Sequence, residues 1–184
     1  MVWAVLNEKQ NGALRELIDG QISDRIVGIV GGAMLDDALR TILEMRLRET
    51  TDESLFRVNG ALGSTAPKIE LAYRLYVFDK PMRQTMHGIV EIRNQMAHLL
   101  DTSFNSEDKG LTAAFGKLRA HEGLTHFPLP GDPHTFRLDP HDTRRDLFFL
   151  SVKLALFALM SDTPKHLPNS NIPTISNMSI NAKA

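Results

Sequence analysis

The sequence predicts an all-α protein, built as a single helical-bundle domain with a flexible C-terminal tail. Long segments carry apolar residues at helical spacing, and most of them start near a residue type that caps helix N-termini. The 184-residue chain, with 42% hydrophobic and 23% charged residues, suits one globular domain with a sizeable core. We expect the domain to span residues 1–161 and a disordered tail, rich in Asn, Ser and Pro, to span residues 162–184.

The first long helix is predicted to begin after Ser23, a good N-cap, and to run to about Glu49. Apolar residues cover much of the circumference of its first half, which is typical of a buried helix. Gly28, Gly31 and Gly32 share one side of it, and each glycine costs up to about 1 kcal/mol inside a helix. A close neighbour is therefore expected on that side, contributed either by this chain or by a second subunit.

The second helix is predicted to start at Ser64 or Thr65 and to end near Phe78. Pro67 falls in its first turn, where a missing N–H group is tolerated. The turn residues that precede this start separate it from the first helix.

The third helix is predicted to follow Asp79 as N-cap and to extend from Pro81 to about Leu100. Arg93 falls in the middle of its apolar face, which comprises Met82, Met86, Ile89, Val90, Met96, Ala97 and Leu100. An arginine on such a face needs a partner, because an unpaired buried charge is very costly. The carboxylates that could supply it from the core are Asp36, Asp37, Glu44 and Glu70. Alternatively the face is an interface or groove where Arg93 meets a partner's backbone or a phosphate; we favour the core pair.

A polar stripe on the same helix holds His87, Glu91, Asn94 and His98. Three of these side chains could ligate a metal, but such spacing arises easily by chance, so we predict neither a metal nor a cofactor. The ring of His98 could instead favour the helix dipole or cap a carbonyl at the helix end. In an ideal helix it lies about 140° from Arg93, so the two reach one ligand only if the helix end unwinds or two copies meet.

Toward the C-terminus, a short helix is predicted from Leu111 to Ala120 and a loop or short hairpin over residues 126–138. Asp142 is the expected N-cap of a last helix that ends near Met160. This helix is apolar nearly all round, and its length suits a core helix better than a membrane span.

Composition narrows the functional classes. The chain has no cysteine, which excludes disulfides and cysteine metal sites and fits a cytoplasmic protein. No apolar run is long enough to span a membrane. The formal net charge is −1, so nucleic-acid binding would need a local basic patch rather than a global field.

Several segments together resemble the mannitol operon repressor family of small helical bacterial proteins. They are Ser23–Arg25, Ile29–Leu39, Gly60–Ser64, Lys68–Tyr73 and Ile92–His98, within roughly residues 23–104. The resemblance implies a transcription regulator without a standard helix-turn-helix. It predicts a cytoplasmic repressor that acts through a dimeric surface or a partner, either protein or nucleic acid.

The stretch from Arg93 to His98, read R-N-x-x-A-H, also resembles the signature of HEPN-type helical domains. That resemblance implies a HEPN-like bundle and, as the alternative function, a metal-independent endoribonuclease of the toxin or defence type that works as a homodimer. In such an enzyme His98 would be the general acid or base, Arg93 would stabilise phosphate charge and Asn94 would orient the site. These three are the candidate catalytic residues only if the protein is a nuclease.

Overall fold

The computed structural model describes residues 12, 22–47, 54–120 and 143–161. Regular structure in these ranges is helical throughout, with α2 (Asp24–Arg46), the short 3-10 helix η2 (Ser54–Phe56), α3 (Thr65–Arg74), α4 (Lys80–His98), α5 (Lys109–Phe115) and α6 (Arg144–Ser161). The all-α prediction is confirmed. The expected loop over residues 126–138 and the expected tail over residues 162–184 lie outside the described ranges.

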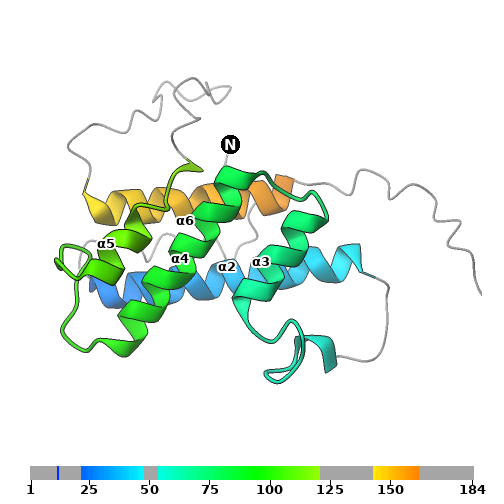
Figure 1. The fold of residues 1–184 in the computed structure, drawn as a ribbon, viewed down its shortest axis with the longest axis horizontal. Helices are drawn as coiled ribbons and strands as arrows, with labels where there is room; N and C mark the ends of the chain where they lie inside the picture. Colours follow the sequence, from blue (N-terminus) through cyan, green and yellow to red (C-terminus); the bar gives the residue numbers. More distant parts are fainter. Residues whose placement is uncertain (1–11, 13–21, 48–53, 121–142, 162–184) are drawn as a thin grey trace, which may run out of the picture.

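Helix α4 occupies the centre of the bundle. It packs against α2, α3, α5 and α6, while α2 packs in addition against α3 and α6. Figure 1 shows α2 and α6 running in the same direction, with α4 crossing in front of both and α3 and α5 flanking it. Among the described helices, none combines the length and the apolar character that a membrane crossing requires.

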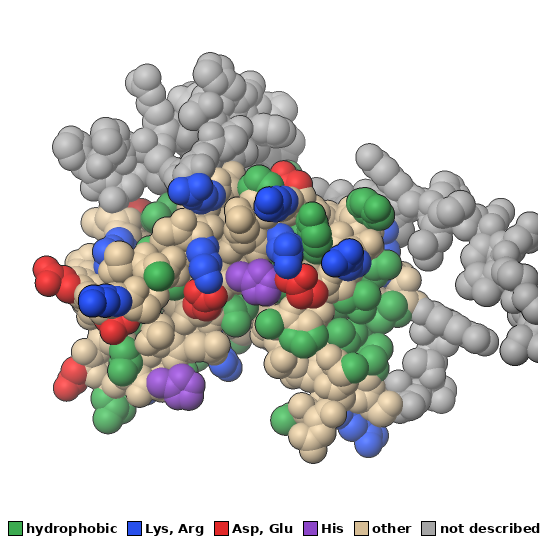
Figure 2. Space-filling model, in the orientation of Figure 1, with side chains coloured by type: hydrophobic (Ala, Val, Ile, Leu, Met, Phe, Trp, Pro, Cys, Tyr) green, Lys and Arg blue, Asp and Glu red, His purple; other side chains and the backbone are tan. Residues whose placement is uncertain are grey.

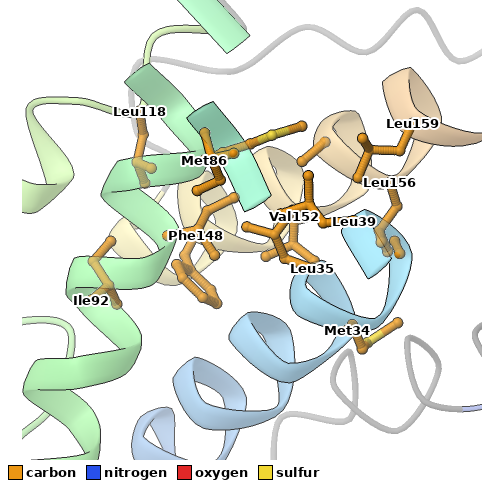
Figure 3. Packing of buried hydrophobic residues seen from close by; sticks show 14 of the residues in the cluster. Met34, Leu35, Leu39, Met86, Ile92, Leu118, Phe148, Val152, Leu156 and Leu159 are labelled. Carbon is orange, nitrogen blue, oxygen red and sulfur yellow. The ribbon is translucent and has the colours of Figure 1, made fainter. Parts of the chain in front are cut away.

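The core lies between α2, α4 and α6. Buried side chains from the three helices converge there, as Figure 3 shows for Leu35, Leu39, Met86, Ile92, Phe148, Val152 and Leu156. Phe148 also stacks obliquely on Phe104, whose ring centroid lies 5.1 Å away, and Phe115 meets Phe104 edge-on at 5.6 Å. These aromatic contacts fasten the loop after α4 to α5 and α6.

Capping side chains begin several helices. Ser23 Oγ accepts a hydrogen bond from the Ile26 amide, and Asp79 Oδ1 accepts one from the Met82 amide at 3.0 Å, which confirms both predicted N-caps. The predicted N-cap of α6, Asp142, lies outside the described residues, and among the described residues Thr143 caps the helix. The Thr143 hydroxyl accepts from the Asp146 amide at 3.2 Å and the Asp146 carboxylate accepts from the Thr143 amide at 3.1 Å, a reciprocal capping box.

Four helices end earlier than predicted, with α2 ending at Arg46 rather than Glu49 and α4 at His98 rather than Leu100. The differences are larger for α3 and α5. Helix α3 stops at Arg74 instead of near Phe78, because Val77 N–H bonds the carbonyl of Ala72 and Tyr76 N–H bonds that of Tyr73. This pair of bonds is a Schellman motif and turns the chain directly into α4. Helix α5 ends at Phe115, where the Gly116 and Lys117 amides close its last turn, and not at Ala120.

Candidate functional site

Arg93 is exposed, which contradicts the prediction that it is a paired core residue. Its aliphatic stem lies across Gly32 of α2, where an added Cβ atom would be 2.5 Å from Arg93 Cγ and 2.6 Å from Arg93 Cβ. The missing side chain at Gly32 therefore lets α4 approach α2, with the guanidinium at the surface. The stem packs while the charged group stays solvated, so no buried charge arises.

The carboxylates expected to pair with Arg93 have other surroundings. Asp36 binds the Lys68 ammonium at 2.7 Å and the Thr65 hydroxyl at 2.7 Å. Two of the remaining candidates form ion pairs with other residues, Glu44 with Arg40 and Glu70 with Arg83. The third, Asp37, is exposed to solvent. Among the described residues no carboxylate forms an ion pair with Arg93.

Asn94 holds the guanidinium of Arg93. Its Oδ1 atom accepts a hydrogen bond from Arg93 Nη1 at 3.0 Å. Among the described residues, Asn94 is the one hydrogen-bond partner of the Arg93 side chain. The other N–H groups of the guanidinium therefore remain available to a ligand. The two residues that the sequence singled out side by side thus form one unit at the surface.

His98 is the last residue of α4 and is exposed. Its side chain makes no hydrogen bond with another described residue, so the predicted carbonyl cap is absent there. Arg25 of α2 takes that position, since its Nε atom donates to the carbonyl of Met96 at 2.9 Å. A cation at a helix C-terminus is favourable, but here it comes from a neighbouring helix.

The other two side chains of the polar stripe on α4, His87 and Glu91, contact partners on neighbouring segments. His87 Nε2 lies 2.8 Å from Glu70 Oε1 on α3, and Glu91 pairs with Lys117 beyond α5. Hydrogen bonds from His87 and then Arg83 hold the pKa of the Glu70 carboxyl below its ordinary value. In the described ranges no three His, Asp or Glu side chains come together as a metal site would need.

The end of α4 is anchored by residues for which the sequence predicted no role. Asp24 accepts from the Phe104 amide at 2.9 Å and from Arg145 Nη1 at 2.8 Å. Arg144 donates to the carbonyls of Phe104 and Ser106, both at 3.1 Å. The loop after His98 is thereby held to the N-terminal ends of α2 and α6. These contacts join distant segments, so no local pattern could have revealed them.

The three glycines of α2 are buried by this chain. An added Cβ atom would lie 2.7 Å from Met96 Cγ at Gly28, 2.8 Å from Phe148 Cε1 at Gly31, and against Arg93 at Gly32. Of the two interpretations of the glycine side, packing within the chain is the correct one. The glycines therefore give no support to a subunit interface.

Among solved structures, one chain is similar to this protein. No family model matches the sequence, and no curated protein matches it either. The fold resembles a chain in the X-ray structure of the MtlR–HPr complex from Escherichia coli, with a TM-score of 0.53 and 19% identity over 84% of this chain and 98% of that one. At this identity the match shows an MtlR-like helical fold.

Proposed function

We propose that this chain is a cytoplasmic regulatory protein that represses transcription through a dimeric surface or a protein partner. The fold it shares with a chain of the MtlR–HPr complex supports a regulator, because MtlR is a mannitol operon regulator. The HPr in that complex supports a protein partner, and an HPr-like protein is the candidate we put forward.

One observation carries the proposal, which is the surface unit of Arg93 and Asn94, with the Arg93 stem packed on buried Gly32. Its arginine has a packed stem, a guanidinium held by an amide and no carboxylate partner among the described residues. Such an arginine has lost part of its freedom before a ligand arrives, so binding costs less entropy. Arginine is also enriched among the residues that dominate protein interfaces. Arg93 is the residue we assign to partner recognition.

The regulatory role is tested in cells. Transcript abundances are compared between a strain that lacks the gene and the same strain carrying wild-type, Arg93→Ala or Arg57→Gln protein. We expect a set of transcripts to rise in the deletion strain and to fall again with wild type and Arg57→Gln, but not with Arg93→Ala. Arg57 is an exposed cation on the turn after η2 and serves as the control. An unchanged transcript set in the deletion strain would overturn the proposal.

Assembly and partner binding are tested with the purified protein. Light scattering during gel filtration is expected to give twice the 20.6 kDa chain mass. Addition of purified E. coli HPr is expected to produce a heavier species with wild type and a weaker one with Arg93→Lys, which keeps the charge but loses the planar fork. A monomeric mass that HPr leaves unchanged would contradict both parts of this proposal.

A second candidate function is the metal-independent endoribonuclease, with Arg93, Asn94 and His98 as catalytic residues. The observation that favours it is the exposure of Arg93 and His98 near the end of α4, where each is open to a ligand. Because α4 stays helical through His98, the two would meet on one ligand only in a dimer. The test is incubation of RNA with the purified protein in the presence of a chelator. Cleavage by wild type that is lost in folded Arg93→Ala and His98→Ala variants supports the enzyme. Intact RNA under all conditions excludes it.

A further inference from the structure

Five cationic residues lie on three neighbouring segments, namely the end of α3, the first turns of α4 and the stretch after α5. They are Arg74, Lys80, Arg83, Lys117 and Arg119, and we call the surface of these segments the basic face. Figure 2 shows Lys and Arg side chains grouped around a histidine over α4 and its two neighbours, with acidic side chains between them. The face is the local basic patch that a chain of net charge −1 would need to bind a polyanion.

Ordered contacts hold the three segments of the basic face together. Arg83 pairs with Glu70 at 2.8 Å, and Lys117 pairs with Glu91. Thr85, which is fully buried, accepts hydrogen bonds through its hydroxyl from the amides of Arg119 at 3.1 Å and Ala120 at 2.9 Å. The segment after α5 is thereby fixed beside the first turns of α4, so the cations are already arranged before any ligand binds.

Two cations of this face have no carboxylate partner among the described residues. Arg83 pairs with Glu70 and Lys117 pairs with Glu91, while the Asp79 carboxylate caps α4. Arg74 and Lys80 are exposed and pair with no carboxylate of the described residues. They are the cations most available to an anionic ligand.

Tyr76 adds an aromatic ring beside these two cations. It sits in the turn between Arg74 and Lys80 with 93% of its surface exposed. Its φ of 57° lies in the left-handed region, which a bulky residue adopts at a cost and where helix ends usually place glycine. A glycine or asparagine would suit the turn better, so the fold does not explain why a tyrosine stands here.

We propose that the basic face binds single-stranded nucleic acid, with phosphates at Arg74 and Lys80 and a base stacked on Tyr76. Exposed aromatic rings beside cations are what sequence-independent single-strand binding requires, since every base offers a π-face and every nucleotide a phosphate. Because 93% of the Tyr76 surface is exposed, a flat base can stack on its ring. Arg93 lies about 140° around α4 from Lys80, so this surface is distinct from the one where Arg93 would recognise a partner.

The test is fluorescence anisotropy of labelled polyuridylate and oligothymidylate of about 20 nucleotides, titrated with the full chain in about 50 mM NaCl. We expect similar affinity for both strands, because stacking and phosphate contacts do not read the sugar, and weaker binding to a duplex of the same length. No anisotropy change at the highest soluble protein concentration would overturn the proposal.

Variants assign the binding to this face. Arg74→Gln/Lys80→Gln is expected to weaken binding and to reduce the slope of log Kd against log salt by about 1.4, as expected for two lost phosphate contacts. Arg57→Gln/Lys109→Gln removes the same charge from exposed positions elsewhere and is the matched control. If both double variants weaken binding equally, the attraction is a general charge effect and the proposal is wrong.

Two substitutions separate stacking from charge. Tyr76→Asn tolerates the left-handed backbone, so the variant folds, and it is expected to weaken binding about tenfold at an unchanged salt slope. Tyr76→Phe keeps the ring and is expected to bind within about twofold of wild type. If Tyr76→Asn binds as wild type does, or if a polyglutamate peptide displaces the RNA as well as unlabelled RNA does, the face recognises acidic protein surfaces and the nucleic-acid proposal fails.

Discussion

Gly32 and Arg93 occupy one space between two helices. A Cβ atom at position 32 would lie 2.5 Å from Arg93 Cγ, closer than side-chain carbons approach in proteins. The stem of Arg93 thus takes the volume that any other residue at position 32 would fill. The aliphatic stem of Arg93 packs against Gly32 while the side chain reaches the surface, so Gly32 determines the position of the guanidinium.

Gly32→Ala is expected to destabilise the protein by about 1–3 kcal/mol and to displace Arg93. The added methyl group also meets Arg93 Cβ at 2.6 Å, so rotation of the arginine alone cannot relieve the contact and α4 must shift from α2. Chemical denaturation measures the change. Ala33→Ser, at the exposed neighbouring position, is the control. Wild-type stability in Gly32→Ala would show that the two helices are not held this closely.

Arg93→Ala is expected to cost no more than about 1 kcal/mol of folding free energy, because an exposed arginine without an ion pair contributes mainly the packing of its stem. A paired core arginine would instead cost about 3–5 kcal/mol. Urea unfolding curves distinguish the two values. A loss in the higher range would restore the core-pair interpretation.

Asp36→Ala is expected to cost about 1–3 kcal/mol, because it leaves the buried ammonium of Lys68 without its carboxylate. The cost stays below that of a fully buried pair, since 37% of the Asp36 side chain is exposed and the space it leaves admits water. Asp37→Ala, at the exposed position next to it, should stay within about 0.5 kcal/mol of wild type. Equal stability of the two variants in thermal unfolding would show that Lys68 reaches solvent.

Gly31→Leu is expected to unfold the protein rather than to dissociate subunits. An added Cβ atom at this position lies 2.8 Å from Phe148 Cε1 and 3.1 Å from Val152 Cγ2, both on α6. A leucine side chain has no room between α2 and α6. Circular dichroism combined with light scattering measures the outcome. A helical, folded monomer derived from a larger wild-type species would mean that this side faces another subunit.

Glu70 should make stability depend on pH. Its carboxyl pKa is lowered in the folded state, chiefly by His87 and then by Arg83, so folding favours the charged form. The stabilisation is therefore complete above the unfolded pKa of about 4.3 and is lost as pH falls through the lower folded value. Wild type should exceed Glu70→Gln by about 0.2–1 kcal/mol at pH 7, since the group is partly exposed. A difference that stays constant down to the acid range would contradict this assignment.

The sequence by itself determined the helices and where several of them begin. Ser23 and Asp79 cap the helices they were expected to cap, because a capping side chain bonds an amide only three residues away. The glycines of the first helix correctly predicted a close neighbour, since their cost must be offset by contact. The resemblance to mannitol operon repressors likewise led to the MtlR-like fold.

Tertiary structure determined which residues of each helix are in contact with other helices and which are exposed. The helical pattern placed Arg93 at the middle of the apolar face, whereas the buried residues of α4 include Thr85, Gly88 and Ile92 and leave Arg93 at the edge. Neighbours on several sides set that buried arc, and helical periodicity contains no information about them. The basic face depends in the same way on contacts between α3, α4 and the segment after α5. Local spacing determines a helix, but long-range packing determines which of its side chains remain at the surface to act.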